Sequence, residues 1–235
     1  MSGHRIVSQD QWLAARRQLL VKEKELLRLR DHLSSERREL PWERVEKRYV
    51  FDGPAGEETL ADLFAGRSQL IVYHFMFAPE WESGCRSCSF WADNFNGVVA
   101  HLQQRDVSLA AISRAPLQKL QAFAARMGWD FKWLSGAKSD FNYDYYVSFR
   151  TEELAHGTAV YNYKAYTGSM RDLPGFSVFC KDESGTIFHT YSTYARGLDS
   201  MNVAFQLLDL VPKGRDEAGL PQPMAWVKLR DQYGT

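Results

Sequence analysis

The stretch QLIVYHFMFAPEWESGCRSCSFWADNF, residues 69–95, decides how the rest of the chain is interpreted. Residues 69–77 form a near-continuous apolar run rich in branched and aromatic side chains, which is typical of a central strand buried on both faces. A loop then leads to Cys85 and Cys88, which form a C-x-x-C motif at the start of a helical segment. This spacing serves redox chemistry and zinc binding alike, so the surrounding sequence has to distinguish between them.

The elements that follow this stretch predict an α/β layer. Residues 107–113 form a second buried apolar run, and we expect helices over 90–104 and over 116–127, the latter with Pro116 in its first turn. The order strand, helix, strand, helix implies parallel strands joined by crossover connections.

A hairpin is expected closer to the C-terminus. Strands beginning at Phe176 and at Thr186 flank a turn over residues 182–185, which predicts an antiparallel pair. A helix over 198–210 follows. The expected fold class is therefore α/β, with a central mixed sheet flanked by helices.

The N-terminal part of the chain predicts one long helix over residues 8–40, ended by Pro41. Ser8 can cap it, with Gln11 in capping-box position. An apolar stripe recurs every seven residues at Trp12, Leu19, Leu26 and Leu33. Two interpretations stay open: an amphipathic helix that packs on its own domain, or a helix that pairs with a second copy in a homodimer.

This pattern suggests three parts. We expect an N-terminal helical extension over residues 1–41, a main domain over 42–212, and a C-terminal tail over 213–235 that wraps the surface. Within the main domain, residues 129–172 form an aromatic-rich insertion without a clear helical period. Short strands that cover one edge of the sheet are expected there, and an aromatic substrate pocket is the alternative.

The position of the two cysteines favours redox chemistry. A helix N-terminus carries unpaired N–H groups and a partial positive charge, which stabilise a thiolate over a thiol. We expect Cys85 to be the exposed, attacking thiolate, with Arg86 adding a positive charge beside it. Cys88, one turn later, is expected to point into the helix–sheet interface, close enough to resolve a mixed disulfide formed at Cys85.

The whole order of elements resembles the thioredoxin fold, and FDGPAGEETLADLFAGRSQLIVYHFMF resembles the entry into thioredoxin-like and peroxiredoxin-like domains. More specifically, FAPEWESGCRSCSFWADNFNG, HTYSTYARGLD and LLDLVPKGRDE resemble an uncharacterised bacterial thioredoxin-like family, the domain-of-unknown-function family 899 (DUF899). This resemblance spans nearly the whole chain. It implies a thioredoxin-like fold and dithiol–disulfide oxidoreductase chemistry, but no physiological substrate.

The resemblance also assigns a supporting residue, Pro174, which matches the cis-proline that faces the C-x-x-C motif in thioredoxin-like proteins. A cis bond there would leave backbone groups free to pair with an extended substrate. A trans proline at a strand start is the alternative. The chain departs from thioredoxins because Trp81 lies four residues before Cys85 and Arg86-Ser87 replaces Gly-Pro. Nearby Glu80 and Glu82 would oppose Arg86.

A peroxiredoxin-like thiol peroxidase is the main alternative. Pro79, Ser83 and Cys85 follow the order of the peroxidatic motif, one residue short of its usual spacing. On this interpretation Cys85 attacks a peroxide and Cys88 resolves the sulfenic acid. The required arginine has three candidates, namely Arg150, Arg171 and Arg196.

Two further alternatives are weaker. C-x-x-C supplies only half of a zinc site, and we expect no metal because Cys180 stands alone and the histidines are scattered. Cys180 itself is expected to be a core thiol. The domain could also be a non-catalytic binding module, with tryptophans such as Trp81 and Trp91 as interface anchors.

Composition limits the partners. The 29 basic and 29 acidic residues balance, so no global field attracts nucleic acid or anionic lipid. Three cysteines make no disulfide scaffold and the N-terminus lacks a secretory signal, so we expect a cytoplasmic bacterial protein without a membrane span. The expected partners are a protein or small-molecule disulfide or thiol substrate and an upstream thiol reductant, and no cofactor is required.

Overall fold

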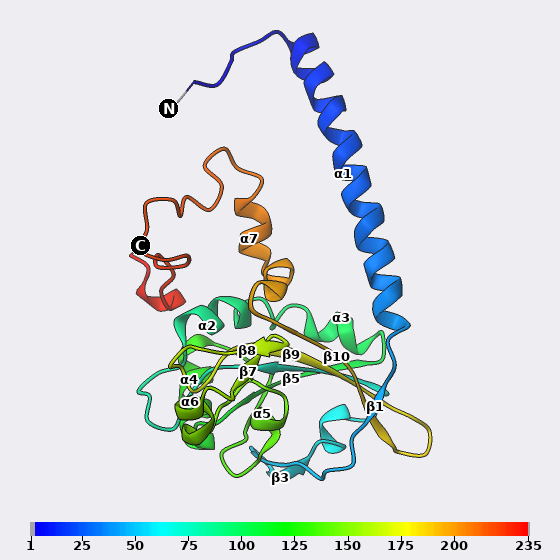
Figure 1. Cartoon of the computed structure of the whole chain (residues 1–235), viewed down its shortest axis with the longest axis vertical. Coiled ribbons are helices and arrows are strands. Elements are labelled where there is room, and N and C mark those ends of the chain that lie inside the picture. Colours follow the sequence, from blue (N-terminus) through cyan, green and yellow to red (C-terminus); the bar gives the residue numbers. More distant parts are fainter. Residues whose placement is uncertain (1–2, 235) are drawn as a thin grey trace. The chain divides into compact units, whose positions relative to one another are not determined.

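The structure is a computed structural model that describes residues 3–234 (Figure 1). The chain divides after Pro41, and residues from Trp42 onward form a separate unit. Helix α1 (Gln9–Arg38) lies in the first unit and confirms the predicted long helix. Its capping box is present: the Ser8 hydroxyl accepts from the Gln11 N–H at 3.3 Å, and the Gln11 side chain accepts from the Ser8 N–H at 3.3 Å.

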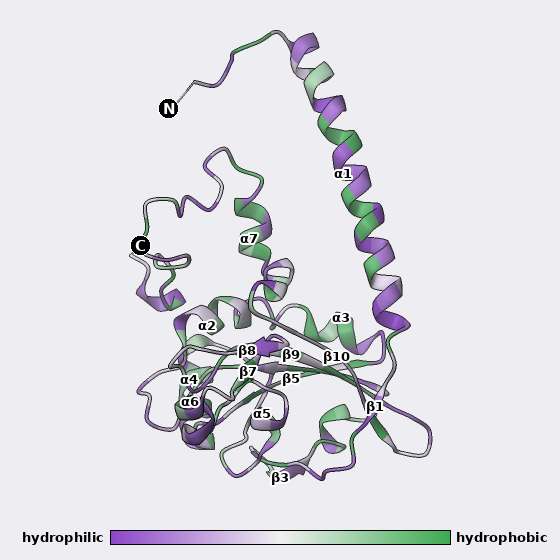
Figure 2. Ribbon diagram, in the orientation of Figure 1, coloured by the Kyte–Doolittle hydropathy of each residue, from purple (hydrophilic) through white to green (hydrophobic). Residues whose placement is uncertain are grey.

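Hydrophobic and hydrophilic residues alternate along the length of α1 (Figure 2). Trp12 is 57% exposed, and the leucines of the same stripe are also exposed. An Arg16–Glu23 ion pair of 2.8 Å joins two successive heptads. Packing on the protein's own domain and pairing with a second copy both stay predictions for this stripe.

The second unit is built on one sheet. In the described part of the chain this sheet has eight strands in the order β1-β10-β9-β4-β5-β6-β2-β3. Their bounds are β1 Glu43–Arg44, β2 Val50–Gly53, β3 Gly56–Thr59, β4 Gln69–His74, β5 Val107–Ser113, β6 Lys132–Ser135, β9 Gly175–Lys181 and β10 Ile187–Tyr194. Strands β7 (Val160–Tyr161) and β8 (Lys164–Ala165) form a separate pair.

The connections within the sheet have thioredoxin-like topology. Strand β4 is central, runs parallel to β5 with His74 beside Ile112, and runs antiparallel to β9 with His74 beside Gly175. Strand β10 pairs with β9 as the predicted antiparallel hairpin. The order β10-β9-β4-β5, with the C-x-x-C motif directly after β4, confirms the predicted mixed α/β fold.

Alternate residues of β4 supply two different cores, because successive side chains on a strand point to opposite faces. We call the side that receives Tyr73 and Phe75 the cysteine face, since Cys88 packs in the same cluster. The side that receives Leu70, Val72 and His74 is the histidine face. Helices α2 and α3 lie on the first side and α5 on the other (Figure 1).

The helices of this unit differ in places from the sequence prediction. Their bounds are α2 Arg86–Ala92, α3 Val99–Gln103, α4 Leu117–Met127, α5 Phe141–Asp144, α6 Thr151–His156 and α7 Val203–Leu208, with 3₁₀ segments η1 Asp62–Phe64, η2 Ala195–Met201 and η3 Arg230–Gln232. The single helix predicted over 90–104 is wrong. Its first part ends because the Asn94 side chain donates to the carbonyl oxygens of Phe90 and Trp91, at 2.9 and 3.0 Å.

Two other segments also depart from expectation. The predicted insertion over 129–172 begins with β6, which is a regular strand of the main sheet between β5 and β2, rather than a cover over its edge. The helix predicted over 198–210 is divided into η2 and α7, since Asn202 caps α7 by accepting from the Phe205 N–H at 3.1 Å.

The C-terminal tail does more than wrap the surface. Val227 and Leu229 are buried, and Leu229 belongs to the apolar cluster of the cysteine face. The tail therefore brings its own side chains to the side of the sheet that holds the cysteines. Over the described residues, no helix is both long and apolar enough to cross a membrane.

Candidate active site

The end of β4 places both cysteines through one backbone unit, that of Met76. The Met76 carbonyl accepts from the Cys85 N–H at 3.0 Å, and the Met76 N–H points at the Cys88 sulfur at 3.4 Å. Cys85 is the N-cap of α2, and its own carbonyl accepts from the Ser89 N–H at 2.9 Å. Cys88 therefore lies inside the first turn, whereas the sequence analysis placed it at the helix start.

The two thiols differ in exposure and acidity, as the redox interpretation requires. Cys85 is partly exposed, whereas Cys88 is 1% exposed, and both are free thiols. A hydrogen bond from the Cys88 thiol lowers the pKa of Cys85 to about 6, against the effect of burial; the N–H groups of Cys88 and Ser87 add to this lowering. Burial and this same bond raise the pKa of Cys88, with the Met76 N–H and Tyr73 acting in opposition.

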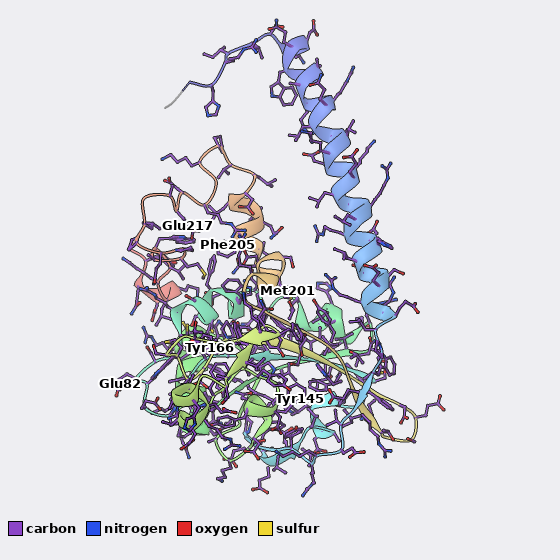
Figure 3. All side chains as sticks on the ribbon, in the orientation of Figure 1. Glu82, Tyr145, Tyr166, Met201, Phe205 and Glu217 are labelled. Carbon is purple, nitrogen blue, oxygen red and sulfur yellow. The ribbon has the colours of Figure 1, made fainter. Side chains whose placement is uncertain are left out.

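The charged side chains around the motif face solvent. Arg86, in the first turn of α2, is exposed, as are Glu80 and Glu82, and Glu82 points outward from its loop (Figure 3). The groups that lower the pKa of Cys85 are hydrogen-bond donors at the helix start. Electrostatic support from Arg86 stays a prediction.

The loop before Cys85 is held tightly. Lys119 on α4 donates to the carbonyl oxygens of Pro79 and Trp81, at 2.8 and 2.9 Å. A Cβ on Gly84 would lie 2.8 Å from Phe75 and 2.9 Å from Phe123, so only glycine allows this close approach. Trp81 packs against the aromatic cluster, and Ser83 is half-buried in the same loop.

Pro174 differs from the expectation in its backbone geometry. The peptide bond before it is trans, so the predicted cis bond is wrong. The segment is held in this form on both sides: the Leu173 N–H donates to the Val147 carbonyl at 2.8 Å, and the Pro174 carbonyl accepts from the Tyr161 hydroxyl at 2.7 Å. Pro174 nevertheless lies near the cysteines, since it lines the same pocket as Cys88.

A pocket of about 700 Å³ opens beside Cys88. Ser87 and Cys88 line it from α2, and other lining residues come from η2, α7 and the tail. The large apolar and aromatic side chains that line it include Tyr73, Met76, Trp91, Tyr161, Leu198 and Phe205. Figure 3 labels Phe205 on α7 and Glu217 on the segment after it, both of which belong to the pocket wall.

Two contributors to this site, Tyr73 and Met76, were missed by the sequence analysis. Tyr73 was assigned only to a buried strand, yet its hydroxyl lies 3.5 Å from the Cys88 carbonyl and acts on the Cys88 thiol. Tyr161 lines the pocket from the predicted insertion, as the aromatic-pocket alternative expected of that segment. Met76 acts through its backbone, for which a sequence gives no residue-specific signal.

The arginines named for the peroxidase alternative lie in different places. Arg150 pairs with Asp140 at 3.0 Å, and Arg171 is exposed. Arg196 lines the pocket but is 91% exposed, with Asp199 at 3.5 Å. The structure thus brings one of the three to the pocket that contains Cys88.

The other candidate ligands and thiols are dispersed. Cys180 is half-buried on β9, where burial raises its pKa. His74 is buried, with Nδ1 2.9 Å from Asn142 and Nε2 2.8 Å from Ser177. Among residues 3–234, no group of three or more histidine, cysteine, aspartate and glutamate side chains is arranged to hold a metal ion.

Comparison with known proteins gives one sequence match. The model of a family described as "Bacterial protein of unknown function (DUF899)" matches residues 1–233. No curated protein matches the chain.

Similar solved structures include peroxidoxin BcpB from Mycobacterium tuberculosis, with 14% identity, coverage of 72% of this chain and 97% of that chain, and a TM-score of 0.46. A cysteine mutant of peroxiredoxin Q from Xanthomonas campestris shows 12% identity, coverage of 72% and 98%, and a TM-score of 0.46. A PrxQ mutant from Xylella fastidiosa shows 10% identity, coverage of 71% of this chain and 94% of that chain, and a TM-score of 0.44.

Proposed function

The chain belongs to the DUF899 family, and we propose that it is a thiol–disulfide oxidoreductase that acts through Cys85 and Cys88. The observation that carries this proposal is the asymmetry of the pair. One sulfur is partly exposed and has a pKa lowered to about 6, and the adjacent sulfur is buried and holds its proton. A thiolate is the reactive form of cysteine, so at neutral pH Cys85 is the nucleophile.

The proposed reaction has two displacement steps. The Cys85 thiolate attacks one sulfur of a substrate disulfide, which forms a mixed disulfide and releases the other substrate half as a thiolate that takes up a proton. Cys88 then loses its proton and attacks the Cys85 sulfur, which forms the Cys85–Cys88 disulfide and releases the second substrate thiol. Two electrons pass from the protein to the substrate, and a second thiol compound must return them. Cys88 supplies one proton and solvent supplies the other, because Cys85 starts as a thiolate.

The second step requires a charge on a buried sulfur. The hydrogen bond that the Cys88 thiol gives to Cys85 is lost when Cys85 enters the mixed disulfide, because that sulfur no longer carries the negative charge. The Met76 N–H at 3.4 Å and the Tyr73 hydroxyl then favour the thiolate of Cys88. Both groups thus act on the resolving thiol.

Single substitutions test the proposal directly. We expect Cys85→Ser to reduce disulfide-reducing turnover to background, because a serine hydroxyl does not ionise at neutral pH. Cys180→Ser is the matched control and should retain wild-type turnover, since Cys180 lies away from the pair on β9. Equal loss in both variants, or wild-type turnover in Cys85→Ser, contradicts the proposal.

A redox titration with thiol-specific mass tags gives an independent measurement. We expect Cys85 and Cys88 to be oxidised together, as a two-electron couple, within the range that cellular thiols span. A pair that stays reduced over that whole range counts against an oxidoreductase. Steady-state peroxide consumption by the same samples separates disulfide exchange from the peroxidase alternative.

A further inference from the structure

The backbone beside the cysteines is already occupied by the protein's own groups. The Leu173 N–H is bonded to Val147, and the Pro174 carbonyl accepts from Tyr161. The Tyr161 hydroxyl also accepts from the Ala195 N–H at 2.9 Å, so it bridges the two walls of the pocket. An extended peptide gains affinity chiefly from main-chain hydrogen bonds to free edge groups, and two of those groups are engaged here.

The space next to the cysteines has the size and character of a small-molecule site. Its volume of about 700 Å³ falls within the range typical of pockets for compact organic ligands. Tyr73, Met76, Trp91 and Phe205 give it an apolar interior. A ligand with an aromatic or aliphatic body gains from displacing water there, whereas a polar one loses hydrogen bonds.

Most charged side chains of the pocket wall have partners within the protein. Arg215 bonds both carboxylate oxygens of Asp209 at 2.9 Å, reaches Asp199 at 3.0 Å, and covers the Phe205 ring at 3.9 Å. The Glu217 carboxylate accepts from the Met224 N–H and the Trp226 indole N–H, both at 2.8 Å. These groups fix the C-terminal wall, so recognition depends on apolar shape.

We propose that the pocket formed by α2, η2, α7 and the tail binds a low-molecular-weight organic disulfide with an apolar body, rather than an extended protein segment. This inference rests on the proposed function. The substrate sulfurs lie beside the lining residues Ser87 and Cys88, where Cys85, which does not itself line the pocket and lies three residues before Cys88, attacks one of them. The dithiol becomes the Cys85–Cys88 disulfide, and the substrate disulfide, which is the oxidant, leaves as two thiols.

The reduced full-length protein is first tested with two disulfides. 4,4′-Dithiodipyridine is small, uncharged and aromatic, whereas insulin presents disulfides in a protein. Each rate constant is divided by that of dithiothreitol with the same disulfide at the same pH, which removes the intrinsic reactivity of the reagent. We expect this relative rate to be at least about tenfold higher for dithiodipyridine, the discrimination that an apolar pocket typically gives.

A charge placed in the wall tests the location. Leu173→Asp puts a carboxylate in the pocket and should slow the reaction with dithiodipyridine about tenfold. Leu207→Asp is the matched control, because Leu207 on α7 is 58% exposed and does not line the pocket, and its rate should equal the wild type. Equal effects in both variants overturn the assignment.

A measurement on the wild type does not depend on the variants folding. 1,2-Bis(4-pyridyl)ethane has nearly the shape of the probe but no disulfide, so it should compete and slow oxidation of Cys85 in a saturable manner. Absence of competition, or a relative rate with insulin equal to or above that with dithiodipyridine, overturns the pocket inference while the proposed function stands. Lack of reaction with either disulfide contradicts the proposed function itself.

Discussion

The cysteine face and the histidine face of the sheet both bury aromatic side chains, with more of them on the cysteine face, but they treat an ionisable group in opposite ways. On the first, hydrogen-bond donors at the start of α2 keep Cys85 ionised, with its pKa lowered to about 6. On the second, burial lowers the pKa of His74 to about 4, so this side chain is neutral. Tyr73 and His74 are neighbours in one strand, yet one faces a site that holds a charge and the other a site that excludes one.

The difference follows from the supply of donors. Cys85 accepts a hydrogen bond from the Cys88 thiol, and the N–H groups of Cys88 and Ser87 at the helix start add to it; together these donors outweigh the cost of desolvating a thiolate. His74 has only neutral partners, Asn142 and Ser177, and the Asn142 hydrogen bond raises its pKa by less than burial lowers it. The Ser177 hydroxyl is hydrogen-bonded to the Ser192 hydroxyl at 2.9 Å, and the Ser192 hydroxyl to His189 Nε2 at 2.7 Å. These bonds extend the polar network to β10.

The largest expected effect concerns the donor that dominates on the cysteine face. Cys88→Ala removes both the resolving thiol and the strongest hydrogen bond to Cys85. We expect disulfide-reducing turnover to fall to background while Cys85 still reacts once, so that a mixed disulfide accumulates and is visible by mass spectrometry. The pKa of Cys85, followed by thiolate absorbance, should rise toward its ordinary value. An unchanged pKa of Cys85 would contradict the role assigned to the Cys88 hydrogen bond.

The second prediction addresses the histidine face. His74→Leu leaves the buried groups of Asn142 and Ser177 without this partner, and each such group costs about 1–3 kcal/mol. We expect the free energy of unfolding to fall by about 3 kcal/mol in urea denaturation. The pKa of Cys85 in the folded variant should be unchanged, because the two groups lie on opposite faces. A shifted thiol pKa would show that the faces are coupled.

The third prediction concerns packing under the cysteine loop. Gly84→Ala places a methyl group within 3.0 Å of two aromatic rings, and overpacking of this kind costs about 1–3 kcal/mol. We expect a loss of about 2 kcal/mol in the free energy of unfolding. Gly219→Ala is the control, since an added Cβ there meets no atom within 4 Å. Equal losses in both variants would contradict the packing argument.

The smallest expected effect is a pH dependence. His74 has a folded pKa of about 4, below its value of 6.5 in an unfolded chain, so between these limits the unfolded state binds more protons. Stability therefore falls as the pH drops through this window, by about 1 kcal/mol between pH 7.5 and pH 5.5. Denaturation at both pH values checks this, and His74→Leu should remove that part of the slope. If the free energy of unfolding of the variant depends equally strongly on pH, groups other than His74 cause that dependence.

The sequence was informative where local chemistry determines the structure. The apolar run of β4, the hairpin and the capping box of α1 follow from periodicity and side-chain type, and the structure confirms them. The C-x-x-C motif at a helix start also predicted a buried Cys88 and an exposed Cys85; the structure has Cys88 buried and Cys85 only partly exposed.

The rest depended on contacts between distant residues. Nothing local to Pro174 shows that Tyr161 will bond its carbonyl, and no spacing rule places Met224 in the wall of a pocket that includes Cys88. Strand β6 was hidden because it has four residues, KWLS, in which apolar and polar side chains do not alternate. Helix propensity alone did not reveal that the Asn94 side chain would end α2.

Asn94 has a consequence beyond the length of that helix. Its amide nitrogen terminates the helix that begins at Cys85, while its oxygen accepts from the Val203 N–H at 3.2 Å, at the first residue of α7. The Asn94 side chain thus connects α2, which positions Cys85 at its N-terminus, to α7, which lines the pocket. A displacement of α7 away from α2 would therefore break this hydrogen bond.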